Sequence, residues 1–308
     1  MALTIGQTVA LSFNSVRDNK RAENQWSESA FLRALESMGG VTRKDLGAQI
    51  EVTLDYQANQ GGIITETDLT PLSLAKTEFL TAAVYDISEI IEPMTWSQKD
   101  EVQNSGRNKK VDLATNLIEN GIDSHDDKIE RALLTTTTGG FLGLGTHITA
   151  AGTGSDGGID SGVNTFWRNQ QATYVDDTDI EAAFTTVYYA CAKGSGSMLV
   201  PTLMVSDGAT EALFEGTQQA LQRWESQDLK AGFKALMFKT AKYVFSQYGG
   251  TSVYFLNTKN FQVVMGKGFF RARSETIPLE NAAGWTTRIY SAGQTVSNNR
   301  SRLGVAHV

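Results

Sequence analysis

Residues 49–56 read QIEVTLDY and alternate polar with apolar side chains at a period of two, which is typical of a half-buried β-strand. A second apolar run, residues 77–96, follows a polar segment with Gly61, Gly62 and Pro71, which favour turns. The sequence therefore predicts a long two-stranded ribbon whose return strand spans 77–96. Such a ribbon is marginal alone in water, and no apolar partner for it is apparent within the chain. We expect another copy of the chain to cover its apolar face.

The composition of the 308-residue chain is that of an ordinary globular protein, with 41% hydrophobic residues and a mean hydropathy of -0.24. No run of 18 apolar residues occurs, and residues 1–13 lack the basic region and cleavage pattern of a secretory signal. We therefore expect a soluble protein, made in a cytoplasm and without membrane contact. The single cysteine, Cys191, excludes an internal disulfide and a metal site built on cysteines.

Charge is segregated along the chain. Residues 46–100 carry nine acidic and two basic residues, whereas residues 256–308 carry two acidic and seven basic residues. Two interpretations remain open: both segments are solvated faces, or the acidic ribbon of one copy docks on the basic tail of another, with complementary charge setting register and partner choice.

A long helix is predicted over residues 108–134, because apolar residues recur there at three- and four-residue spacing and acidic residues lie on the opposite side. The four threonines at 135–138 and Gly139-Gly140 end it. His125 falls on the apolar stripe, where a satisfied buried histidine is the expected role. Compact α/β alternation follows, with predicted helices at 180–191 and after Ser206-Asp207, and strands at 198–205, 233–239, 242–246 and 252–256. The tail from 269 to 308 is again strand-like.

Candidate catalytic motifs are weak. The three histidines, His125, His147 and His307, lie in different predicted elements, and no convergent nucleophile and base are evident. The segment 194–197 (GSGS) misses a nucleophile elbow because Lys193 stands where its first glycine belongs. We therefore predict no catalytic residue, no cofactor and no metal.

The order of elements resembles that of a tailed-bacteriophage major capsid protein of the Hong Kong 97 type. Three strings carry the resemblance: LIENGIDSHDDKIERALLTTTTGG (117–140) is similar to the family's spine helix, and LMVSDGATEALFEGTQQALQRW (203–224) with GFKALMFKTAKYVFSQYGGTSVYFLN (232–257) is similar to its axial lobe. The resemblance implies an α+β fold with an N-terminal arm (1–45), an extended β-ribbon loop (46–100), a peripheral domain (101–177 and 257–308) that contains the spine helix, and an axial α/β domain (178–256).

The resemblance also implies a structural protein of the virion, made in the bacterial host cytoplasm. Its hexamers and pentamers would close into an icosahedral shell around double-stranded DNA, touching the DNA only weakly and without sequence preference. A separate scaffolding protein, a portal and a cement protein are the implied partners. Covalent linking of subunits is not expected, because the ribbon tip from Asn59 to Leu74 contains no lysine.

Within this interpretation, ion pairs between copies are the candidate assembly interface. The acidic residues are Glu66, Asp68, Asp86, Glu89 and Glu92, and the basic ones are Arg271, Arg273, Arg288, Arg300 and Arg302. Three alternatives remain open: a nanocompartment shell protein of the same fold, an α/β hydrolase-like enzyme, and a monomeric binding module. The enzyme would need a nucleophile and base, and the module would have to explain an uncovered ribbon.

Overall fold

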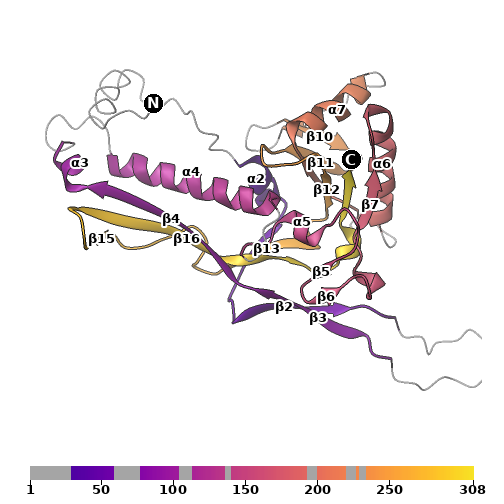
Figure 1. The fold of residues 1–308 in the computed structure, drawn as a ribbon, viewed down its shortest axis with the longest axis horizontal. Coiled ribbons are helices and arrows are strands. Elements are labelled where there is room, and N and C mark those ends of the chain that lie inside the picture. The colour runs from indigo at the N-terminus through magenta and orange to yellow at the C-terminus, as the bar shows by residue number, and fades with distance from the viewer. Residues whose placement is uncertain are drawn as a thin grey trace, which may run out of the picture.

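A computed structural model describes residues 29–58, 77–103, 113–135, 140–192, 200–219, 227–228 and 234–308. In Figure 1 a long helix lies along a sheet at one end of the molecule, a second sheet with two helices forms the other end, and a β-ribbon lies below the second sheet and runs toward the lower right of the view. No helix of these residues is long and apolar enough to cross a membrane.

The central sheet is organised around its longest strand, β16 (Gly284–Ser297), which pairs antiparallel with β4 (Ser88–Ser97) over ten residues. On its other side β16 pairs successively with β13 (Phe261–Gly266), β14 (Ala272–Arg273) and β15 (Ile277–Pro278). Strand β1 (Val41–Lys44) joins β13 in parallel.

Helix α4 (Leu113–Leu134) covers one face of this sheet. It approaches closely because Gly121 has no side chain, and a Cβ there would meet Met94 and Ile289 of the sheet. His125 is fully buried, with Nε2 2.8 Å from Ser291 Oγ, and burial lowers its pKa. The predicted end of the helix at the threonines and the burial of His125 are confirmed, although only one ring nitrogen of His125 has a hydrogen-bond partner among the described residues. Residues 108–112 lie outside the described residues. Short helix α3 (Gln98–Gln103) precedes α4, and α5 (Leu144–His147) follows it.

The second sheet has the strand order β7-β17-β12-β8-β11-β10-β9 in the described part of the chain. Its strands are β7 (Gln170–Thr173), β8 (Leu203–Ser206), β9 (Gln227–Asp228), β10 (Lys234–Phe238), β11 (Ala241–Phe245), β12 (Val253–Leu256) and β17 (Gly304–His307). Helices α6 (Asp177–Cys191) and α7 (Gly208–Gln219) flank it. The predicted α/β alternation is confirmed, although β7 and β17, which the sequence assigned to the peripheral domain, pair into this sheet. Cys191 is buried in its core.

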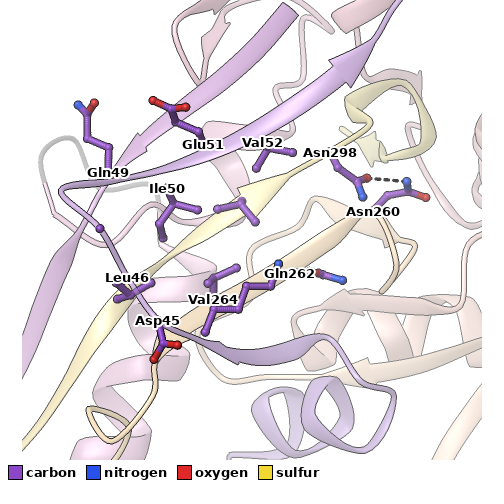
Figure 2. Close-up of a pocket in the computed structure, with 13 residues that line it drawn as sticks. Asp45, Leu46, Gln49, Ile50, Glu51, Val52, Asn260, Gln262, Val264 and Asn298 are labelled. Atoms are coloured by element: carbon purple, nitrogen blue, oxygen red, sulfur yellow. Dashed lines mark hydrogen bonds between the residues drawn. The ribbon is translucent and has the colours of Figure 1, made fainter. Parts of the chain in front are cut away.

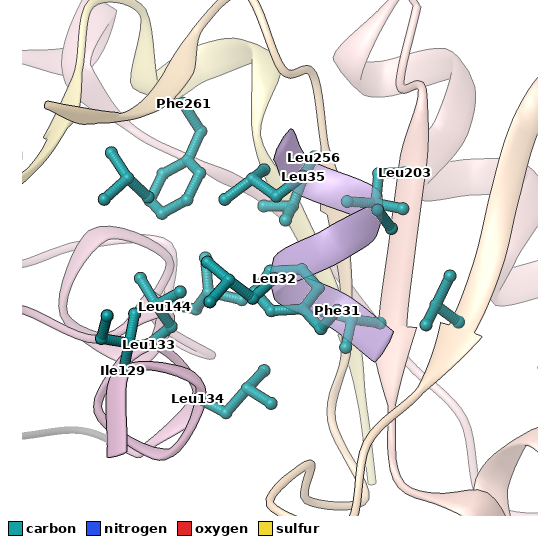
Figure 3. Packing of buried hydrophobic residues seen from close by; sticks show 14 of the residues in the cluster. Phe31, Leu32, Leu35, Ile129, Leu133, Leu134, Leu144, Leu203, Leu256 and Phe261 are labelled. Atoms are coloured by element: carbon teal, nitrogen blue, oxygen red, sulfur yellow. The ribbon is translucent and has the colours of Figure 1, made fainter. Parts of the chain in front are cut away.

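Helix α2 (Ala30–Ser37) lies in the main hydrophobic core, where the two sheets meet. Figure 3 shows Phe31, Leu32 and Leu35 between Ile129 and Leu133 of α4 and Leu203 of β8. The sequence assigned this segment to an N-terminal arm. With α2 in the core and β1 in the central sheet, residues 30–44 form part of the body.

The ribbon differs from its prediction in two ways. Its return strand is two strands: β3 (Leu80–Asp86) pairs with β2 (Gln49–Asp55), whereas β4, beyond Ile87, pairs with β16. The expectation that its apolar face has no partner within the chain is wrong for the described residues. Leu54, Ala83 and Tyr85 are buried against the chain's own body, in a cluster with Ile159, Trp167, Val264 and Val296. The tip, residues 59–76, lies outside the described residues.

Candidate assembly surface

The face of the central sheet away from α4 carries a surface of apolar side chains around one arginine, and we call this surface the bare sheet face. It consists of Ile91 and Pro93 on β4, Arg288 and Tyr290 on β16, and Ile277 on β15. Ile91 lies opposite Tyr290, and Pro93 lies opposite Arg288, so these four side chains share one face of the sheet. Met94 and Ile289, one position along each strand, point to the other face, where α4 covers them.

The bare sheet face is accessible to a partner. Ile91 is 48% exposed and Ile277 46% exposed, and Phe269, 51% exposed, extends the surface with its ring centroid 6.1 Å from that of Tyr290. Apolar residues exposed together in this way mark sites of protein association. Sequence reasoning missed this surface, because it depends on the pairing of two strands about 200 residues apart in the chain.

The structure separates the predicted interface residues into three groups. The first group is accessible. Arg288 is exposed on the bare sheet face, Arg273 is exposed on β14 at the sheet edge, and Arg302 is half-buried. Glu89 is exposed at the end of the same face, opposite Ala292, and Asp86 ends β3. Glu66 and Asp68 lie outside the described residues.

The second group is held in contacts within the chain. Arg271 Nε lies 2.7 Å from Asp126 Oδ1 on α4, and its Nη1 lies 3.2 Å from Glu36 Oε1 on α2. Glu92 forms an ion pair with Lys128 of α4, on the face away from the bare sheet face. These pairs fasten α2 and α4 to the sheet, and the contacts predicted for Arg271 and Glu92 with another copy would have to compete with them.

Arg300 alone forms the third group, because it is fully buried. Its guanidinium donates through Nε to the carbonyl oxygen of His147 and through Nη1 to that of Gly154 and to Ser161 Oγ. The predicted role of Arg300 in an interface is therefore wrong for this structure. The sequence offers no signal that distinguishes Arg300 from Arg302, since the carbonyl groups that solvate Arg300 come from a loop about 150 residues earlier.

Three residues next to Arg300 have contacts like those of a hydrolase triad. Nε2 of His147 lies 2.8 Å from Thr295 Oγ1, and its Nδ1 lies 3.0 Å from Asp156 Oδ1. All three residues are buried, however, and the Thr295 hydroxyl donates to the carbonyl oxygen of Leu142 at 2.7 Å. A nucleophile must reach its substrate, so we assign this arrangement a structural role. Within the described ranges no group of three or more His, Cys, Asp or Glu residues is placed to hold a metal ion.

Comparisons with known sequences give no match, either to a protein-family model or to a curated protein. Solved structures do match. The chain is similar to a subunit of the cyanophage A-1(L) capsid, with a TM-score of 0.65, 14% identity, and coverage of 93% of this chain and 94% of that one. It is also similar to the capsid of a native GTA particle, with a TM-score of 0.61 and 10% identity over 94% and 92% of the two chains.

A further match is the SrpI encapsulin complex of Synechococcus elongatus, with a TM-score of 0.62 and 9% identity over 100% of this chain and 96% of that one. Identities this low establish the fold and leave the function to be argued separately. The chain has the fold shared by phage capsid and encapsulin subunits, and the predicted Hong Kong 97-type α+β fold is confirmed.

Proposed function

We propose that this chain is the major capsid protein of a tailed bacteriophage. In this role it is a structural protein without enzymatic activity, and it assembles as hexamers and pentamers into an icosahedral shell around double-stranded DNA. It is made in the bacterial host cytoplasm and resides in the virion. The observation that carries the proposal is the likeness to capsid subunits over more than nine-tenths of both chains.

The bare sheet face supports self-assembly. Covering this face removes apolar side chains from water, which stabilises the contact by about 25 cal/mol per Å² of apolar area. The side chains are those of Ile91, Ile277, Tyr290 and Phe269. The occupant we propose is the acidic ribbon of a neighbouring copy, with Glu66 and Asp68 near its tip and Asp86 at its base. Arg288, Arg273 and Arg302 supply the complementary charge. Each contact is weak, and a closed shell repeats it many times.

In this proposal α4 and the central sheet form the peripheral domain, the second sheet with α6 and α7 forms the axial domain, and β2–β3 is the base of the extended loop. Cohesion is non-covalent, with a separate scaffolding protein, a portal and a cement protein as partners. Contact with DNA is weak, because a chain of net charge -7 attracts phosphates poorly.

A nanocompartment shell is the second candidate, and the match to the SrpI encapsulin over 100% of this chain favours it. The two candidates differ in content, since a nanocompartment encloses protein cargo and a phage capsid encloses DNA.

Particle size and content test the proposal. Sedimentation and negative-stain microscopy of the purified protein should reveal megadalton shells, whereas a monomeric enzyme or binding module would sediment as a single chain of 33.5 kDa. Particles recovered from the producing bacterium should contain DNA that resists nuclease. Shells with protein cargo and no DNA would favour the nanocompartment, and a stable monomer at high concentration would overturn both candidates.

A further inference from the structure

The second sheet has two ends that differ in charge. Strand β11 is parallel to β8, β7 is parallel to β17, and β12 is antiparallel to both β8 and β17, so β7, β8, β11 and β17 all run in one direction. We call the end at which these four strands finish the carboxyl end, and the opposite end the amino end.

Exposed apolar side chains lie at the carboxyl end. Phe245, the last residue of β11, is 41% exposed, and Val175, between β7 and α6, is 78% exposed. Phe245 lies beside the start of α7, since a Cβ on Gly208 would lie 3.7 Å from its ring. Apolar residues exposed in this way are typical of the centre of a protein interface.

The charges at the carboxyl end are negative. They belong to Asp176, Asp177 and Asp179 at the start of α6 and to Asp207 and Glu211 at the start of α7. Among the described residues, none of these carboxylates forms an ion pair with a lysine or arginine. Burial and the nearby Glu215 raise the pKa of Glu211 to about 7. The dipoles of α6 and α7 favour carboxylates here, but they do not explain the exposed Phe245 and Val175 beside them.

The amino end has positive charge around a tyrosine. Tyr189, in the last turn of α6, is 64% exposed, and the Lys239 Nζ lies 4.0 Å from its ring centroid. Lys239 occupies the turn between β10 and β11 with φ +55°, a conformation that favours glycine. A lysine at a strained position indicates a role for its side chain. Lys242 and Lys259 add positive charge at this end.

The cavity between the ribbon and the central sheet has no such uniform charge. Its volume is about 260 Å³. Figure 2 shows its apolar lining, which includes Leu46, Ile50, Val52 and Val264. Its rim carries Lys44 together with Asp45 and Glu51, so charge gives this cavity no preferred partner.

The two ends of the second sheet cannot neutralise each other within one chain. Strand β11 separates Lys239 from the carboxyl end by five residues, or roughly 15 Å, whereas an ion pair needs about 4 Å. We propose that the carboxyl end of one copy docks on the amino end of the next copy, with Phe245 and Tyr189 at the centre of the contact and the charges around them. Such a contact joins two different surfaces, so it is heterologous and can close into a ring. It rests on the shell function proposed above and specifies which surfaces join the copies of one ring.

Cross-linking between copies tests this contact directly. Assemblies of the full chain with both Tyr189→Cys and Phe245→Cys are treated with a short bis-maleimide, which joins neighbouring thiols; Cys191 is buried and does not react. We expect a ladder of covalent oligomers on a denaturing gel, because each copy links to two neighbours. Either substitution alone should give monomers, since unlike ends meet. Dimers from a single variant, or a double variant that stays monomeric on the gel, would overturn the contact.

Charge reversal at the amino end is the second measurement. In the double-cysteine chain, Lys239→Glu should reduce the cross-linked fraction about tenfold at low salt and less at high salt, because it sets like charges against each other. Lys239→Gly replaces it if the reversed charge prevents folding, since glycine suits φ +55°. Arg33→Glu, which makes the same change in net charge on α2, should have little effect, and equal losses in both variants would overturn the role of charge. Shells that form without this cross-link would overturn the contact alone, whereas a chain that never assembles would overturn the shell function as well.

Discussion

The Glu130 carboxylate accepts a hydrogen bond from the backbone N–H of Leu32, with 3.3 Å between Oε2 and N. Leu32 lies in the first turn of α2, where N–H groups lack partners within the helix, and the nearby Ser29 side chain makes no capping bond. A residue 98 positions later therefore caps this helix. The other carboxylate oxygen of Glu130 accepts from the Ser246 hydroxyl at the end of β11. Glu130 thus joins α2, α4 and the second sheet at one point.

Burial raises the pKa of Glu130, so the folded chain holds this proton more tightly than the unfolded chain does. Protonation of Glu130 therefore adds to the free energy of unfolding. This contribution is fully present below the pKa of Glu130 in the unfolded chain, and it is lost as the pH rises through the raised pKa in the folded chain. Glu130→Gln should remove this dependence, because its amide still accepts from Leu32 and donates to Ser246. We expect a free energy of unfolding at pH 8 equal to wild type or up to about 1–2 kcal/mol higher.

Urea unfolding at pH 5 and pH 8 measures this effect. Glu130→Ala is the matched variant, since it leaves two buried donors without a partner and should cost about 2–3 kcal/mol at both pH values. If the free energy of unfolding of Glu130→Gln differs between pH 5 and pH 8 by as much as that of the wild type, Glu130 is not the titrating group.

Gly157→Ala should loosen the base of the ribbon. The new Cβ would meet Ala83 and Tyr85, and alanine is strained at φ +58°, so we expect a cost of about 1–3 kcal/mol. Gly158→Ala is the control: its φ is +79°, but no atom lies within 4 Å of the added Cβ. Amide hydrogen exchange of residues 80–86 should accelerate more in Gly157→Ala than in Gly158→Ala. Equal acceleration in the two variants would show that backbone strain alone, and not the contact with Ala83 and Tyr85, causes the loss of stability.

Local patterns in the sequence predicted the elements whose partners lie nearby. The apolar stripe of α4, its end at the threonines and the alternation in β2 all depend on neighbouring residues, and the structure confirms them. The break at Ile87 was not predictable, because nothing local separates a strand that pairs with β2 from one that pairs with β16. The same limit applies to the charges: Arg288 and Arg300 look alike in sequence, yet one is exposed on the sheet and the other is enclosed by carbonyl groups from a distant loop.

Leu35→Ala tests whether α2 belongs to the body or to a detachable arm. Leu35 is fully buried between the two sheets, so its truncation should lower the free energy of unfolding by about 2–5 kcal/mol. The control, Arg33→Ala, changes an exposed position of the same helix and should have a much smaller effect. A detachable arm would instead give similar urea midpoints for both variants.

Arg288→Glu tests the charge complementarity proposed for the bare sheet face. The reversed charge would face the acidic ribbon of a neighbouring copy, and like charges brought together at an interface cost up to several kcal/mol. We expect the yield of sedimenting shells to fall at low salt and to recover partly at high salt, because ions screen the repulsion. Arg33→Glu makes the same change in net charge on α2, away from the bare sheet face, and should leave the yield near wild type. If the two variants lose yield equally, net charge rather than this surface governs assembly. If neither loses yield, the ribbon of a neighbour does not contact Arg288.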